Sequence, residues 1–163
     1  MVTDLPEQLI TQAEQQLRIF PVTEANSRRA VSTAYYAVFH LLIRTAISNW
    51  TQIEHHPQLA RTFEHRRMKE ASIAILKVIG RVDSEVTTSN DAVPMRLWFV
   101  ANAFVDLQEL RHRADYDIAT PFDPLTAAVS VALVRQTFEI WTEIKDQPLS
   151  QRYLYSLLFK ERS

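Results

Sequence analysis

Two segments of the chain, residues 27–40 and 110–117, carry arginine, histidine and tyrosine inside long helical patterns. In the second segment, Arg111 lies beside the apolar stripe of its own helix rather than opposite it. A guanidinium cannot release its proton, so a covered Arg111 needs a carboxylate, a carbonyl, a ligand phosphate or a partner chain beside it. Which of these groups receives the charge is the functional question that the sequence raises.

These residue types suit chemistry at a phosphodiester. Cleavage of RNA through its 2′-OH needs a base, an acid and positive charge on the phosphorane. Arg111 could supply the charge, His112 or His40 could titrate near neutrality, and Tyr116 could donate a proton. Arg111, His112 and Tyr116 are therefore the candidate catalytic residues. In the alternative interpretation Asp115, four residues after Arg111, neutralises the arginine and the pair is structural.

The first segment supplies candidate binding residues. On a helical wheel Arg29, Tyr36 and His40 gather with Thr33 and Arg44 opposite the apolar stripe. They form either a solvated polar face or a wall of hydrogen-bond donors toward a groove or a second subunit. With Asp115 added, Arg29, Tyr36 and His40 make up the predicted binding set.

The elements that must position these residues are helices. The chain has one glycine and seven prolines in 163 residues, with little hairpin turn chemistry and no convincing period-2 strand. We expect an all-α fold, an up-and-down bundle of four to five long helices plus a short C-terminal helix, in one domain over 1–163. The predicted helices cover about 4–20, 23–50, 56–80, 90–116, 123–145 and 148–159.

Local signals set the ends of these helices. Asp4 and Glu7 form a capping box at the first, and Thr23 can cap the second. Gly80 is the predicted C-cap of the third, and the polar segment 81–90 is the predicted loop after it. Asn90 or Asp91, with Pro94, opens the fourth.

The fourth helix is apolar on two sides. Leu97, Val100, Ala103, Phe104, Leu107, Leu110 and Ala114 make one face, and Trp98, Ala101, Val105, His112 and Tyr116 make the other. Such a helix is either central in the bundle or shared with a partner chain. In a chain of this size a homodimer is the more economical explanation, and it would let Arg111 of both chains meet one phosphate.

Bulk composition limits the classes of function. The chain is 47% hydrophobic and 23% charged with a formal net charge of -1, so its overall field demands neither nucleic acid nor membrane. It has no cysteine, which excludes disulfides and fits a reducing cytosol. Without a signal-peptide pattern or an apolar run of about 18 residues, we expect a cytoplasmic protein that does not cross a membrane.

Both segments resemble motifs of the prokaryotic HEPN domain family, and the second is similar to that of a subgroup of small stand-alone HEPN proteins. The matching residues are Arg28, Arg29, Ala30, Tyr35, Tyr36, Ala37, Phe39 and His40, then Leu110, Arg111, Ala114, Asp115, Tyr116 and Asp117. They cover about two helices of the chain.

This resemblance implies an all-α bundle, usually dimeric, that binds or cleaves RNA or nucleotides. Many HEPN proteins are metal-independent RNases, and some are toxins paired with a nucleotidyltransferase antitoxin. Their nuclease signature is an arginine, usually followed by a polar residue, and then a histidine after four to six intervening positions. Here Arg111 and His112 supply the first half, but Tyr116 stands where the shortest spacing would place the histidine. Two hypotheses follow, an RNase centred on Arg111 and His112, or a catalytically silent module that holds RNA, a nucleotide or a protein in the same groove. A helical scaffold is the third.

Other clusters give weaker signals. His55, His56 and His65 with Glu54 and Glu64 lack the tight spacing of zinc ligands, so we expect no metal, and no cofactor motif is recognisable. The basic residues Arg61, His65, Arg66, Arg67 and Lys69 form either a solvated face or a surface that steers RNA. The apolar stripe in 151–161 either caps the bundle or contacts a partner helix.

Overall fold

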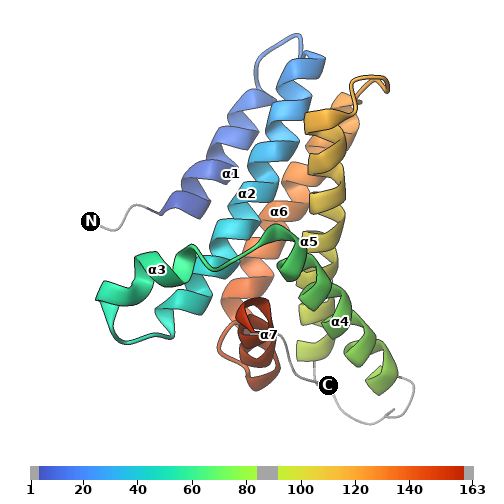
Figure 1. Ribbon diagram of the computed structural model, residues 1–163. Helices are drawn as coiled ribbons and strands as arrows, with labels where there is room; N and C mark the ends of the chain where they lie inside the picture. Colours follow the sequence, from blue (N-terminus) through green and yellow to red (C-terminus); the bar gives the residue numbers. More distant parts are fainter. Residues whose placement is uncertain (1–3, 84–91, 160–163) are drawn as a thin grey trace. The chain divides into compact units, whose positions relative to one another are not determined.

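The computed structural model describes residues 4–83 and 92–159, and the predicted all-α class is confirmed over these residues. They form seven α-helices and one short 3-10 helix, with no strand among them (Figure 1). The helices are α1 (Leu5–Gln16), α2 (Glu24–Ser48), α3 (His56–Ala60), α4 (His65–Asp83), α5 (Val93–Tyr116), α6 (Pro124–Ile144) and α7 (Pro148–Leu158), with η1 (Ile53–His55) before α3.

The predicted N-terminal caps are confirmed at the first two helices. The Glu7 backbone N–H donates to Oδ1 of Asp4 at 3.3 Å, and the Asn26 N–H donates to Oγ1 of Thr23 at 3.1 Å. Each bond satisfies a donor that the first turn of a helix leaves without an intrahelical partner. The predicted caps of α5, Asn90 and Asp91, lie outside the described residues.

Three predicted boundaries are wrong. The first helix ends at Gln16, four residues earlier than expected. The third predicted helix is two helices, because the chain turns between Ala60 and His65 and buries Phe63 there. Gly80 does not end α4, which continues to Asp83; it takes no positive φ, and the start of the predicted loop 81–90 is therefore helical.

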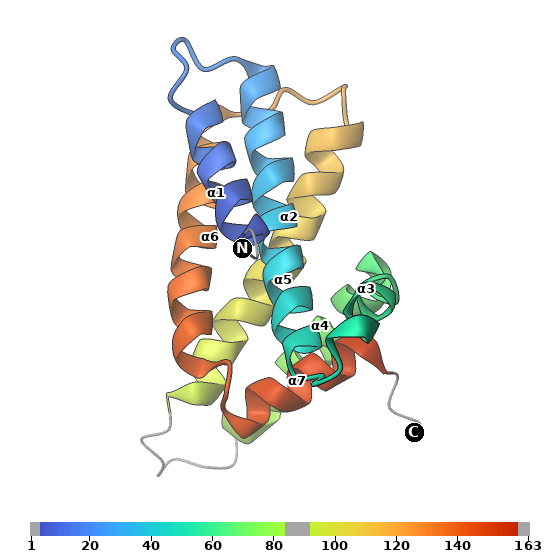
Figure 2. The ribbon, with the colours of Figure 1, turned by 90° about the vertical axis from the view of Figure 1, so that its left-hand side faces the viewer.

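The chain groups into two compact units. Unit 1 comprises residues 1–41 and 106–138, and holds α1, most of α2, the last part of α5 and the first part of α6. Within it the four helical segments run alternately up and down, as predicted (Figures 1 and 2). Its core includes Ile10, Ala13, Val31, Ala34, Tyr35, Val38, Leu107, Ala127, Val131 and Val134.

Arg135 joins two helices of unit 1. Its guanidinium forms ion pairs with Glu7 and Glu14 of α1, with Nε of Arg135 2.6 Å from Oε1 of Glu14. The hydrogen bond from Arg135 lowers the pKa of Glu14. All three side chains stay partly exposed, so the contribution to stability is modest and the pairing chiefly fixes how α1 lies on α6.

Unit 2 comprises residues 42–105 and 139–163. It holds the end of α2, η1, α3, α4, the start of α5, the end of α6 and α7, and α4 packs against α7. At that contact the fully buried Tyr153 hydroxyl lies 2.7 Å from Oγ of Ser72, which donates its own proton to the Met68 carbonyl. Tyr153 is therefore the donor of the pair. Burial raises the pKa of its phenol.

Helix α2 has the length and mean hydropathy, 1.2, of a membrane-spanning helix, although the sequence shows no long uninterrupted apolar run. Two thirds of that apolar window, 67%, is buried inside the protein. Burial of this extent is what a central core helix requires. Its residues 30–35 are all buried, which explains why they include no charged side chain.

Replacing Tyr153 by Phe should lower the free energy of unfolding by about 1 kcal/mol, since it removes a buried hydrogen bond without creating a cavity. Urea denaturation monitored by circular dichroism would measure the change. Tyr155→Phe on the same helix is the matched control, because that ring is exposed and its substitution should have no measurable effect. Equal effects of the two substitutions would contradict the role given to the Ser72 hydrogen bond.

Candidate functional site

The candidate residues of unit 1 surround an open polar hollow of about 500 Å³ between the first half of α2 and the end of α5. Arg29, Tyr36, Asp115 and Tyr116, four of the predicted site residues, line it directly. The other lining residues are Ala25, Arg28, Ser32 and Ala114. Arginine, hydroxyl and aromatic groups on one concave surface are the groups that recognise phosphates and bases.

Arg28 fixes the end of α5 beside the start of α2. Its Nη1 donates to the carbonyls of Arg113 and Ala114 at 3.1 and 3.0 Å, and its Nη2 donates to the Thr120 carbonyl at 2.8 Å. The Arg113 carbonyl also accepts from the Asp117 N–H, whereas the last carbonyls of a helix generally lack backbone donors, so a cation at this end supplies hydrogen bonds and offsets the helix dipole. Its guanidinium also lies 5.5 Å from the centre of the Phe122 ring.

Glu24 completes this anchor. Its Oε1 accepts from Nη2 of Arg28 at 2.7 Å and from the Phe122 N–H at 3.2 Å. The hydrogen bond from Arg28 holds the pKa of this carboxyl below its usual value. In the same loop Asp117 accepts from the N–H groups of Ala119 and Thr120, both at 3.2 Å. Arg28 is thus fully occupied within the fold, although it lines the hollow.

Arg111 is the predicted central residue, but it does not line the hollow; it is mostly covered and contacts two residues that do, Tyr36 and Asp115. Its side chain is 13% exposed, and the guanidinium carbon lies 5.3 Å from the Tyr35 ring centre and 5.8 Å from that of Tyr36. These distances are those of cation–π contacts. Burial lowers the pKa of Arg111, but Tyr36, Tyr35 and Asp115 together raise it above its ordinary value, so the group stays a cation.

The charge of Arg111 is only partly compensated. Its Nη1 is 3.5 Å from Oδ2 of Asp115, the long limit of a hydrogen bond, and no described residue accepts a hydrogen bond from its buried Nε. Ser32 donates to the same Asp115 oxygen at 3.3 Å. The predicted i,i+4 pair is therefore present, but it is a weak one. Arg111 also shares a hydrogen bond with the Tyr35 side chain, so Nε is its one donor without an acceptor among the described residues.

His40 stands one turn beyond the hollow on α2. Its ring stacks with Tyr36 at a centroid distance of 6.4 Å, and it is partly buried. Burial lowers its pKa, which favours the neutral imidazole. His40 is thus connected to the hollow through Tyr36 but does not line it.

His112 and Tyr116 form the outer pair. Their ring centroids are 5.0 Å apart, and both residues are exposed, Tyr116 by 65%. Tyr116 lines the hollow and His112 does not. Because neighbouring helix residues point about 100° apart, Arg111 faces α2 while His112 faces away from it. The structure therefore separates the two residues that an RNase mechanism would use together.

Sequence reasoning placed the face of α2 slightly off its true position. It grouped Thr33 with Arg29, Tyr36 and His40, but Thr33 is buried, 7% exposed, and Ser32 lines the hollow instead. The face of α2 that lines the hollow consists of residues 25, 28, 29, 32 and 36. The anchoring role of Arg28 has no signal of its own, because it depends on a carbonyl eighty-five positions away.

The secondary clusters serve local structure. His56 hydrogen-bonds through Nε2 to the Trp50 carbonyl at 2.7 Å, Arg67 donates to the Leu158 carbonyl at 3.1 Å, and Arg66 pairs with Glu70 at 2.9 Å. Within residues 4–83 and 92–159, no three His, Asp or Glu side chains gather where they could hold a metal ion.

The chain was compared with models of protein families, with curated proteins and with solved structures, and none of the three comparisons gave a match.

Replacing Arg28 by Lys should lower the free energy of unfolding by about 1 to 2 kcal/mol, because an ammonium cannot bridge three carbonyls and a carboxylate at once. Urea denaturation would measure the loss. Arg29→Lys is the matched control. It makes the same substitution at an exposed neighbour and should leave stability unaltered. An equal loss of unfolding free energy in Arg28→Lys and Arg29→Lys would contradict the anchoring role of Arg28.

His40 should make the protein less stable in mild acid. Its pKa is lower in the folded state than the ordinary 6.5, so the unfolded chain binds the proton more readily. Stability is lost as the pH falls below 6.5, until the lowered pKa is passed. His40→Gln should reduce the difference in unfolding free energy between pH 8 and pH 5, measured by urea titrations at both values. An unchanged difference would show that His40 does not contribute to it.

Proposed function

We propose that the hollow of unit 1 binds RNA through a phosphate group and that the protein is a binding module rather than a nuclease. The observation that supports this most directly is the state of Arg111. It is a mostly covered cation whose Nε has no acceptor among the described residues and whose single ion pair is 3.5 Å long. An anion bound against Tyr36 and Asp115, the lining residues that contact Arg111, would give this cation a second negative partner beside its long ion pair.

The distribution of charge supports an anionic ligand. Arg28 is engaged by carbonyls and Glu24, whereas Arg29 is exposed at the hollow. A phosphate there would meet Arg29 from the open side and Arg111 from behind Tyr36 and Asp115. Asp115 would compete with this phosphate, because the Asp115 carboxylate already pairs with the Arg111 guanidinium. Displacing or neutralising Asp115 should therefore strengthen binding.

Aromatic side chains support a nucleic-acid ligand over a free phosphate ion. Tyr116 is 65% exposed at the hollow, and Tyr36 lines its opposite side. Exposed aromatic rings beside arginines provide stacking surfaces for unpaired bases, independent of their sequence. RNA carries both the phosphate and the base, and so matches both features of the hollow.

The position of the histidines favours binding over cleavage. No histidine lies among the described residues that line the hollow. His40 is one aromatic ring away through Tyr36, and His112 lies outside it against Tyr116. A general base must come within hydrogen-bond reach of the proton that it removes. In the signature that the sequence resembles, a histidine would stand at position 116, where this chain has a tyrosine.

The test is a titration of the protein into a labelled single-stranded RNA in EDTA, with fluorescence anisotropy as the readout. Arg111→Gln should weaken binding about tenfold, because a charge-assisted hydrogen bond contributes roughly 1.5 to 3 kcal/mol. Arg29→Gln should weaken it and lower the dependence on salt by about one counterion. Asp115→Asn should strengthen it, since it removes the competing carboxylate.

Arg66→Gln is the matched control, because Arg66 is an exposed arginine of unit 2 with its own ion pair to Glu70. It should bind RNA like the unaltered protein. Equal weakening by Arg66→Gln and Arg111→Gln would mean that any positive charge suffices, which would contradict a site in the hollow. RNA cleavage in EDTA that disappears in Arg111→Gln would replace the binding proposal by the nuclease hypothesis.

A further inference from the structure

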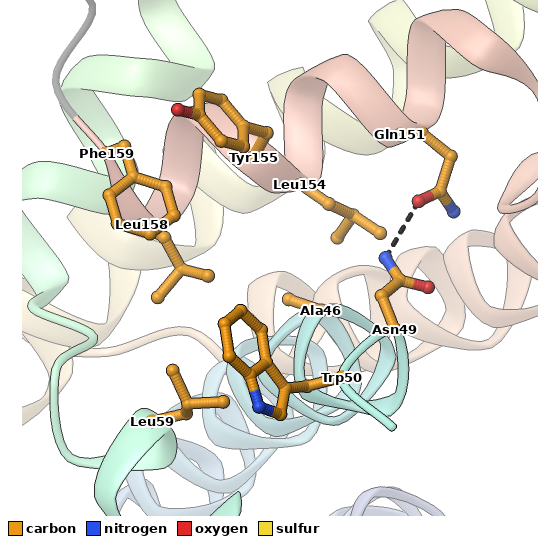
Figure 3. Close-up of a pocket in the computed structure, with 9 residues that line it drawn as sticks. All are labelled: Ala46, Asn49, Trp50, Leu59, Gln151, Leu154, Tyr155, Leu158 and Phe159. Carbon is orange, nitrogen blue, oxygen red and sulfur yellow. Dashed lines mark hydrogen bonds between the residues drawn. The ribbon is translucent and has the colours of Figure 1, made fainter. Parts of the chain in front are cut away.

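We infer that unit 2 contains a second site, a pocket that binds a small, flat and uncharged aromatic molecule. The pocket has a volume of about 270 Å³ and lies between the end of α2, α3 and α7 (Figure 3). Trp50 and Leu59 lie on one side of it, and Leu154 and Leu158 of α7 lie on the other. Unlike the hollow of unit 1, it is lined by no charged side chain.

Exposed aromatic rings mark this pocket as more than a packing defect. Trp50 is 47% exposed, Tyr155 57% and Phe159 47%, and all three line it. Soluble proteins rarely leave several large apolar side chains open to water around one concave surface unless something covers them. The ring centroids of Tyr155 and Phe159 are 4.8 Å apart, so these two rings already pack on each other. The ring of Trp50 is therefore the one with a face available to a ligand.

The indole is held with its polar edge occupied. Nε1 of Trp50 donates to Oε1 of Gln52 at 3.1 Å, and the Trp50 carbonyl hydrogen-bonds to Nε2 of His56 at 2.7 Å. The first bond restricts the rotation of the ring and the second holds the backbone of Trp50, so a flat molecule that stacks on the indole has less motion to restrict. Such preorganisation raises affinity by reducing the entropy lost on binding.

The chemistry of the lining excludes a charged occupant. All its side chains are apolar or neutral, and none belongs to Asp, Glu, Lys, Arg or His. Asn49 and Gln151 close one end by bonding to each other at 2.7 Å, and Gln151 also donates to the Lys145 carbonyl at 2.7 Å. An ion placed here would lose water without gaining a counter-charge, which is strongly unfavourable.

The volume limits the size of the ligand. An apolar cavity of about 150 Å³ accepts benzene, so a pocket of 270 Å³ accepts two fused rings but little more. Naphthol, which is uncharged at neutral pH, is therefore a suitable probe. A ligand of this size should bind with a dissociation constant on the order of 100 µM.

The test is calorimetric titration of the full chain with naphthol and with naphthalene sulfonate, which has the same rings and one negative charge. Naphthol should bind, and the sulfonate should bind at least about tenfold more weakly because its charge has no partner in the pocket. N-acetyltryptophanamide represents the other source of such a ring, a side chain of another protein. Tighter binding of that probe than of naphthol would overturn the assignment to a free small molecule.

Two variants connect the binding to this pocket. Trp50→Ala should weaken naphthol binding about tenfold, because it removes the stacking surface. Ala46→Leu should abolish naphthol binding, because the larger side chain would occupy the pocket. Trp98→Ala is the matched control, since Trp98 is 39% exposed in unit 2 and does not line the pocket. Thermal unfolding would establish that each variant is folded. Absence of naphthol binding to the unaltered protein, or equal weakening by Trp50→Ala and Trp98→Ala, would overturn the inference.

Discussion

Arg28 donates to the carbonyls at the end of α5 while its own helix carries the opposite wall of the hollow, so one side chain fixes both walls. The Arg113 carbonyl also accepts from the Asp117 N–H at 3.0 Å, so the donor from Arg28 matters most at Ala114, a lining residue whose carbonyl would otherwise repel an anion. With Arg28 and Glu24 in place, the negative end of the α5 dipole is neutralised inside the fold. The hollow can then present positive charge from Arg29 and Arg111 beside a helix C-terminus, which is ordinarily a poor place for a phosphate.

Two arginines that line the hollow and a third that contacts its lining therefore have three different states. Arg28 is saturated by carbonyls and a carboxylate, Arg29 is exposed, and Arg111 is covered and held by aromatic faces and a long ion pair. Only the last combines low exposure with a donor, Nε, that lacks an acceptor among the described residues. This is why Arg111 supports the proposed function more strongly than the exposed Arg29, although both carry the same charge. Cations already desolvated by the fold lose less on binding an anion.

Sequence periodicity and local signals predicted the start of most helices well, because local chemistry sets where these helices begin. Asp4, Thr23, Pro124 and Pro148 act within one turn, and the helices begin where these residues indicate. The break at 61–64 was missed because it depends on burying Phe63, a tertiary effect. The prediction at Gly80 failed for a different reason: this glycine keeps helical backbone angles without a positive φ and lies inside α4, so its residue type alone did not end the helix. Periodicity also identified Arg111, but the anchor at Arg28 and the pocket at Trp50 involve residues far apart in sequence. The homodimer stays a prediction.

Aromatic residues serve opposite purposes in the two units. In unit 1 the faces of Tyr35 and Tyr36 receive a guanidinium, so their π-electrons help hold a cation in a partly covered position. In unit 2 the face of Trp50 meets no cation from the lining of its pocket, and its neighbours Leu59, Leu154 and Leu158 are aliphatic. A ring face beside a cation assists the binding of anions, whereas a ring face among aliphatic side chains favours another uncharged ring. The residue type alone does not decide which ligand a cavity takes, and the charge placed beside the ring does.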